Sequence, residues 1–128
     1  MSKKIKVVMV EPGKVARIEE IDNSLESMQS IVGGWIEAYY PFEEEVCIVC
    51  NDDGKINGMP LNRAIYTEDQ EMMDIIAGPF FVCDCSGEEF DSLNDEQCQC
   101  YLEKFRYPEQ FFRTSNGIAA IPYHPESN

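Results

Sequence analysis

Residues 4–10 read KIKVVMV, and a second run, VARIEEI at residues 15–21, follows the turn residues Glu11–Lys14. Both runs are rich in β-branched residues and partly alternate polar with apolar side chains, which is typical of half-buried strands. Pro12 and Gly13 supply turn chemistry between them. The sequence therefore predicts that the chain opens with a β-hairpin, around which the other elements are placed.

Two helices are predicted after the hairpin, each from a capping box followed by apolar residues at helical spacing. Asn23 and Glu26 form the first box, and Gly33–Gly34 ends that helix. Asn94 and Gln97 form the second box. The apolar positions are Leu25, Met28 and Val32 in the first helix and Cys98, Tyr101, Leu102 and Phe105 in the second.

Further strands are predicted at residues 35–40, 45–50 and 74–85, where β-branched and aromatic residues gather. Gly78–Pro79 interrupts the last run and indicates a bend or a break. Asn51–Gly54 is predicted to be a hairpin turn, since it lacks the alternating acids of a calcium loop. Residues 55–73 show no clear period, so we expect a long loop there.

These elements predict an α+β fold in the order β-β-α-β-β-β-α. Short connections favour a mainly antiparallel sheet, and we expect both helices to pack on one face of it. The predicted domain covers residues 1–105. Residues 106–128 contain Pro and aromatic residues without a long period and are predicted to be a C-terminal extension.

The charge is strongly acidic and unevenly distributed. The 128 residues include 24 Asp and Glu against 10 Lys and Arg, a net charge of −14. Residues 1–17 carry a net +4, whereas residues 64–103 contain 11 acids and no Lys or Arg. This charge opposes direct binding to nucleic acid or to anionic membranes, so any charged partner should be basic.

No residue set nominates a catalytic centre. The only histidine, His124, lies between Pro122 and Pro125, and no phosphate-binding glycine loop or nucleophile elbow is present. We therefore expect a non-enzymatic protein without a cofactor. The apolar run at residues 7–10 is too short for a signal peptide, and no run approaches the ~20 residues of a membrane span. We expect a soluble, cytoplasmic protein.

The six cysteines form three close pairs, at residues 47 and 50, 83 and 85, and 98 and 100. Such pairs invite a structural zinc interpretation. However, residues 47 and 50 of a strand point to opposite faces, as do residues 98 and 100 of a helix. Only Cys83 and Cys85 share a direction, so we expect neither a bound metal nor an obligatory disulfide.

Several segments together resemble a known family: VMVEPG at residues 8–13, the stretch at 20–37, CNDDGKINGMPLNRAI at 50–65 and IAGPFFVC at 76–83. The chain resembles, over about residues 4–105, a domain-of-unknown-function family of small acidic proteins. That family occurs in Gram-positive gut bacteria, their phages, plasmids and conjugative elements. The resemblance implies an accessory role in a mobile element and transfers no site residue.

Crowded carboxylates without interleaved cations can imitate the phosphates of a nucleic acid and occupy a basic groove of another protein. The alternative for such a surface is that it only confers solubility. We predict an acidic inhibitor of a nucleic-acid-binding host defence protein, of the anti-restriction or anti-CRISPR type. Its predicted partner-binding residues are Glu68, Asp69, Glu71, Asp74, Glu88, Glu89 and Asp91.

A second hypothesis is a small-molecule binding protein that sequesters a nucleotide-derived signal. Arg63 is the last basic residue before Lys104, and Asn62 precedes it. Both could contact a phosphate while Trp35 or Tyr66 stacks on a base. Alternatively, Asn62 and Arg63 form internal hydrogen bonds or an internal salt bridge that ties the loop.

Overall fold

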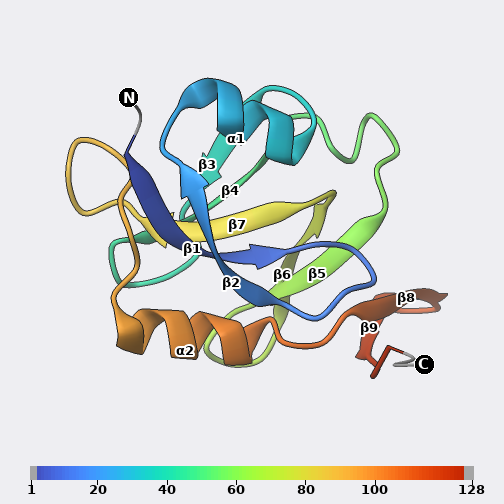
Figure 1. Ribbon diagram of the computed structural model, residues 1–128. Helices are drawn as coiled ribbons and strands as arrows, with labels where there is room; N and C mark the ends of the chain where they lie inside the picture. Colours follow the sequence, from blue (N-terminus) through green and yellow to red (C-terminus); the bar gives the residue numbers. More distant parts are fainter. Residues whose placement is uncertain (1–2, 126–128) are drawn as a thin grey trace.

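The opening hairpin is present, as predicted, in strands β1 (Lys4–Val10) and β2 (Arg17–Asp22) (Figure 1). The computed structural model describes residues 3–125. Within the hairpin, Lys4 lies opposite Asp22 and Met9 lies opposite Arg17, so the two strands pair antiparallel along almost their full length. Within residues 3–125, no helix is long and apolar enough to cross a membrane.

Five antiparallel strands form the main sheet, in the order β2-β1-β7-β4-β3. The three other strands are β3 (Ile36–Tyr39), β4 (Val46–Asn51) and β7 (Phe80–Asp84). Strand β7 lies at the centre, paired with β1 on one side and with β4 on the other. Its side chains from Phe80 to Cys83 are all buried, because both faces of the sheet are covered.

Two further hairpins lie outside the main sheet. They are β5 (Leu61–Tyr66) with β6 (Met72–Ala77), and β8 (Glu109–Thr114) with β9 (Gly117–Pro122). The prediction of a long loop at residues 55–73 is therefore wrong. The run at 74–85 is two strands, divided at Gly78, whose φ of 84° ends β6. The turn at Asn51–Gly54 is present, but it is not a hairpin turn, because β4 does not pair with β5.

The two helices are α1 (Leu25–Val32) and α2 (Asp95–Lys104). The predicted capping box of α2 is confirmed: Asn94 accepts from the Gln97 backbone, and the Gln97 side chain accepts from the Asn94 backbone. The cap of α1 lies one residue later than predicted. Ser24 Oγ accepts from Ser27 N, and the Asn23 side chain donates to the Phe90 carbonyl oxygen instead.

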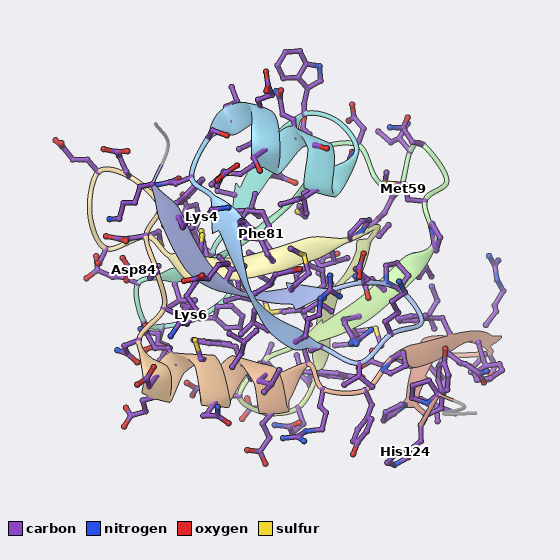
Figure 2. The ribbon with its side chains drawn as sticks, in the orientation of Figure 1. Lys4, Lys6, Met59, Phe81, Asp84 and His124 are labelled. Atoms are coloured by element: carbon purple, nitrogen blue, oxygen red, sulfur yellow. The ribbon has the colours of Figure 1, made fainter. Side chains whose placement is uncertain are left out.

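The prediction that both helices pack on one face of the sheet is wrong. Helix α1 covers one face and α2 covers the other (Figures 1 and 2). Met28 of α1 packs in one core, and Cys98, Tyr101 and Phe105 at α2 pack in the other. Hairpin β5–β6 adds Ile65 and Ile76 to the α2 side. The residues that β1, β4 and β7 direct to the α1 face include Ile5, Val7, Met9, Cys47, Val49, Phe81 and Cys83; those on the α2 face include Val8, Val10, Val46, Ile48, Cys50, Phe80 and Val82. Alternate residues of each strand thus enter two different cores.

Candidate functional site

Exposed or half-exposed carboxylates gather around α2. Some come from the loop between β7 and α2, some from the helix itself, and others from the β3–β4 loop and the β5–β6 turn beside its C-terminal half (Figure 1). We call this set the acidic strip. Its members are Glu43, Glu44, Glu68, Asp69, Glu71, Asp91, Asp95, Glu96 and Glu103.

A groove of about 560 Å³ runs through the acidic strip where α2, the β3–β4 loop and the β5–β6 turn meet. Glu43, Glu44 and Glu68 line it. The Tyr101 hydroxyl donates to Glu44 Oε1, which holds this carboxylate in place. Burial, followed by the Glu44 carboxylate, raises the pKa of Tyr101, so the phenol remains a donor at neutral pH.

One cation lies inside this groove. Lys104 Nζ is 5.9 Å from the centroid of the Phe42 ring, a distance at which the ring face attracts a cation. Phe42 in turn packs on Tyr101, with ring centroids 4.8 Å apart. The groove thus combines carboxylates with aromatic rings, which is a suitable surface for lysine and arginine side chains.

Few acids of the strip have an ion-pair partner. Asp91 Oδ1 is 3.0 Å from Lys3 Nζ, and Asp95 Oδ1 is 3.7 Å from Lys6 Nζ. Within the described part of the chain, the other seven carboxylates of the strip have no Lys, Arg or His nitrogen within 4.0 Å. Because these charges are not neutralised internally, they set a negative potential along α2.

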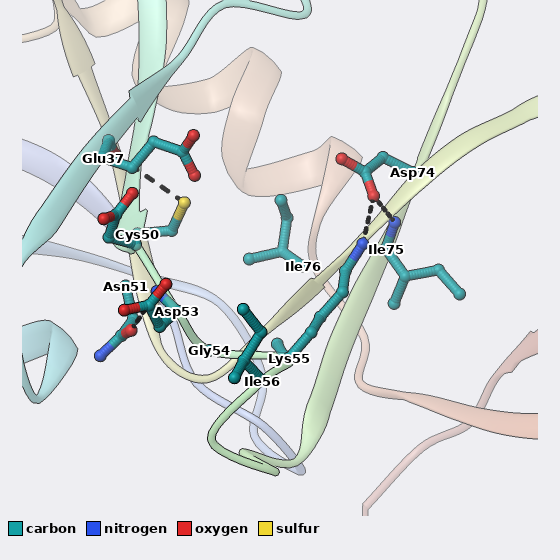
Figure 3. A pocket seen from close by; sticks show the side chains of 12 residues that line it. Glu37, Cys50, Asn51, Asp53, Gly54, Lys55, Ile56, Asp74, Ile75 and Ile76 are labelled. Carbon is teal, nitrogen blue, oxygen red and sulfur yellow. Dashed lines mark hydrogen bonds and ion pairs between the residues drawn. The ribbon is translucent and has the colours of Figure 1, made fainter.

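A second hollow, of about 260 Å³, lies between the ends of β3 and β4 and the middle of β6 (Figure 3). Lys55 Nζ reaches across it to Asp74 Oδ1 at 2.6 Å. Cys50 lies in its wall and donates to the Glu37 carbonyl oxygen at 3.8 Å; burial, the main cause, raises the pKa of this thiol to about 12. Gly54 and Ala77 both line the hollow. Their backbones approach so closely that a Cβ on Gly54 would lie 2.6 Å from the Ala77 carbonyl oxygen.

The structure divides the seven predicted partner-binding acids into three places. Glu68, Asp69 and Glu71 lie on the β5–β6 turn. A second group, in the loop before α2, comprises Glu88, Glu89 and Asp91. Asp74 lies apart, in the hollow with Lys55. The group on the β5–β6 turn and Asp91 therefore belong to the acidic strip. Glu88 and Glu89 lie beside Leu25 and Met28 of α1 and, like Asp74, do not belong to it.

Sequence reasoning missed other acids at these sites. Glu43 and Glu44 join the groove, and the run of three glutamates at 43–45 was a visible signal for them. In the second hollow, Asp52 and Asp53 were visible as a pair. Glu37 had no such signal, because its position depends on the β3–β4 register that sets it opposite Cys50.

Asn62 and Arg63, proposed from the sequence as contacts to a ligand, are almost completely buried. The Arg63 guanidinium donates to the carbonyl oxygens of Phe105, Asn62 and Lys14 and to Asn62 Oδ1, at 2.7–3.2 Å. The Asn62 amide donates to the Val10 and Gly78 carbonyl oxygens. Both side chains therefore form an internal tie, the other interpretation that the sequence left open.

The two aromatic candidates of the same hypothesis have separate surroundings. Trp35, between α1 and β3, is 73% exposed. Tyr66, at the end of β5, lines the acidic groove beside Thr67 and Gln70. The Arg63 guanidinium is buried, so it is not available to contact the phosphate of a nucleotide stacked on either ring.

The cysteines have the orientations predicted for them. Cys47 and Cys50 face opposite cores, Cys83 and Cys85 share the α1 face, and Cys98 is buried whereas Cys100 is exposed. Strand pairing adds one contact that spacing could not indicate: Cys47 Sγ and Cys83 Sγ lie 3.9 Å apart as free thiols. Between residues 3 and 125, no cluster of three His, Cys, Asp or Glu side chains is arranged to hold a metal ion.

Comparisons with known proteins identify a family but no characterised relative. A family model described as a domain of unknown function, DUF3846, matches residues 5–106. No curated protein and no solved structure matches the chain. The family match ends just before hairpin β8–β9.

Proposed function

We propose that this chain, which belongs to the DUF3846 family of domains of unknown function, is a non-enzymatic inhibitor that binds a basic nucleic-acid-binding surface of another protein. The observation that carries the proposal is the acidic strip around α2, seven of whose carboxylates have no ion-pair partner among residues 3–125. Such an array can displace nucleic acid from a basic groove by supplying equivalent negative charge.

The groove beside α2 supports this proposal. It places Glu43, Glu44 and Glu68 near the Phe42 and Tyr101 rings. Basic grooves that bind DNA or RNA present lysine and arginine side chains, and carboxylates with aromatic faces bind both. Tyr101 orients Glu44 before any partner arrives, so less ordering is required on binding.

The partner class follows from the charge and from the resemblance to proteins of mobile elements. We propose a host defence protein of the restriction or CRISPR type, encountered in the bacterial cytoplasm. Direct binding of the chain to nucleic acid is disfavoured, because a protein with a net charge of −14 repels the phosphates. The nucleotide hypothesis is not favoured, because Arg63, its proposed phosphate contact, donates to internal oxygens.

The experiment measures how much labelled duplex DNA candidate restriction and CRISPR nucleases bind, by fluorescence anisotropy, with increasing amounts of this protein. We expect displacement of the DNA that weakens as salt rises from about 50 to 200 mM. The variant Glu68→Lys/Asp69→Lys/Glu71→Lys should lose inhibition by about tenfold or more, because like charges then face each other.

A matched control variant changes the net charge by the same amount, but at positions outside the acidic strip. Three exposed glutamates on other elements serve for this control: Glu20 on β2, Glu26 on α1 and Glu37 on β3. None of them has an ion-pair partner among residues 3–125. Their combined reversal to lysine should leave most of the inhibition intact. Equal loss in both triple variants would mean that only net charge matters, and no displacement from any nuclease at 50 mM salt would refute the proposed function.

A further inference from the structure

Strand β9 is an edge strand without a charged residue. Its sequence from Gly117 to Pro122 is GIAAIP, and it pairs only with β8 in a two-stranded sheet. An edge strand has unpaired backbone groups along one side, and proteins commonly protect such edges with charges. Strand β9 lacks this protection.

The edges of the main sheet are protected. Strand β2 carries Arg17, Glu19 and Glu20, and β3 carries Glu37. Arg17 is further engaged with Glu11 at 2.6 Å and with Glu19 at 3.0 Å. In contrast with these two edge strands, β9 carries no charged side chain that would oppose pairing with another strand.

The outer face of the hairpin carries apolar side chains and no charge. In the register of β8 and β9, Phe112 lies opposite Ala119 and Gln110 lies opposite Ile121, so these four side chains share one face. The opposite face carries Glu109, which accepts a hydrogen bond from Ala64 N on β5 at 2.8 Å. Phe112 and Ile121 thus point away from β5, and they are 47% and 53% exposed.

A two-stranded hairpin alone is marginally stable in water and gains from additional strands. We propose that β9 pairs antiparallel with β9 of a second copy of this chain, forming a four-stranded sheet across a two-fold axis. In this dimer Phe112, Ala119 and Ile121 of both copies would form a shared apolar surface. An antiparallel contact between identical strands is self-complementary, as a closed two-fold dimer requires.

The distribution of charge favours a second copy as the occupant. Two copies of the chain, each with a net charge of −14, repel each other most where acidic side chains of one copy face those of the other. Hairpin β8–β9 is the place where approach costs least, because its two charged residues are Arg113 and the inward-facing Glu109. A basic protein, in contrast, would find no carboxylate to pair with along β9.

The test is the mass of the full chain in solution, measured by sedimentation velocity from about 1 to 200 µM in 150 mM salt. We expect a concentration-dependent dimer. Two single variants, Ile118→Lys and Ile121→Lys, each place a charge on strand β9, at side chains that are 45% and 53% exposed. Each variant should be a monomer, and its circular dichroism spectrum should be that of the wild type.

Trp35→Lys is the matched control, since Trp35 is the exposed aromatic residue between α1 and β3. This variant should remain dimeric. A wild-type protein that is monomeric at 200 µM would overturn the proposal, as would a dimer that persists in both β9 variants. The measurement involves no nuclease, so its result is independent of the proposed inhibitory function.

Discussion

Arg63 Nε donates to the Phe105 carbonyl oxygen over 3.1 Å, which joins the middle of β5 to the residue that ends α2. The same guanidinium also donates to the Lys14 oxygen, next to the β1–β2 turn. One buried side chain therefore connects three segments that are far apart in the sequence. Burial lowers its pKa to about 10, so it remains charged at neutral pH.

Replacing Arg63 with Met should destabilise the fold by about 3 kcal/mol, because the buried Phe105 oxygen and the partly buried Lys14 oxygen would both lose their donor. Urea unfolding measures the difference. Arg106→Met is the control: Arg106 is exposed, so we expect a change within about 0.5 kcal/mol. Equal stability of the two variants would mean that the Arg63 tie contributes little.

The stability of the protein should depend on Glu109 as pH changes. Burial, the largest cause, raises the pKa of this carboxyl above its ordinary 4.5. The folded state then holds the proton more tightly than the unfolded state, so stability falls as pH rises from 4.5 through the raised pKa. Glu109→Gln should match wild type at pH 4 and have a higher Tm at pH 7. A difference that is constant with pH would contradict this assignment.

Cys100 should be the fast-reacting thiol of the native protein. It is exposed on α2, whereas Cys98 is buried and burial raises its pKa. Cys85 is half-buried with a pKa raised to about 11, again mainly by burial, so it should react more slowly. Ellman's reagent should detect about one fast thiol, which Cys100→Ser abolishes. A fast phase that survives this substitution would place the reactive thiol elsewhere.

Added salt should stabilise the isolated protein, because unpaired carboxylates of the acidic strip repel one another. Between about 20 and 300 mM sodium chloride, we expect Tm to rise. In the Glu68→Lys/Asp69→Lys/Glu71→Lys variant this dependence should be weaker, with an equal or higher Tm at low salt. If salt leaves the wild-type Tm unchanged, the carboxylates are too far apart to interact.

Local signals in the sequence predicted local structure well. The Asn94 and Gln97 capping box marks the start of α2, and the opening hairpin lies where its turn residues indicated. Strand β5 escaped prediction because the buried Asn62 and Arg63 interrupt its apolar pattern. Their burial depends on carbonyl oxygens from distant segments, which no local pattern contains.

The positions of the helices required knowledge of the sheet. The apolar run Val7–Val10 is buried on both faces, which indicates a strand covered on two sides. The predicted placement of both helices on one face did not use this signal. The acidic strip was foreseen in part: the run at 64–103 indicated an acidic segment, but only the fold brings Glu43 and Glu44 beside Glu68.

The central position of β7 also sets the order in which the protein can complete its fold during synthesis. Strands β1 and β4 are joined only through β7, which ends at Asp84, although β4 is already finished at Asn51. A ribosome-bound chain that lacks residues 80–84 therefore exposes two unpaired apolar strand edges. Because these pairings are distant in sequence, we expect folding to be slow compared with helical proteins of this size, and nascent chains to be prone to association until β7 emerges.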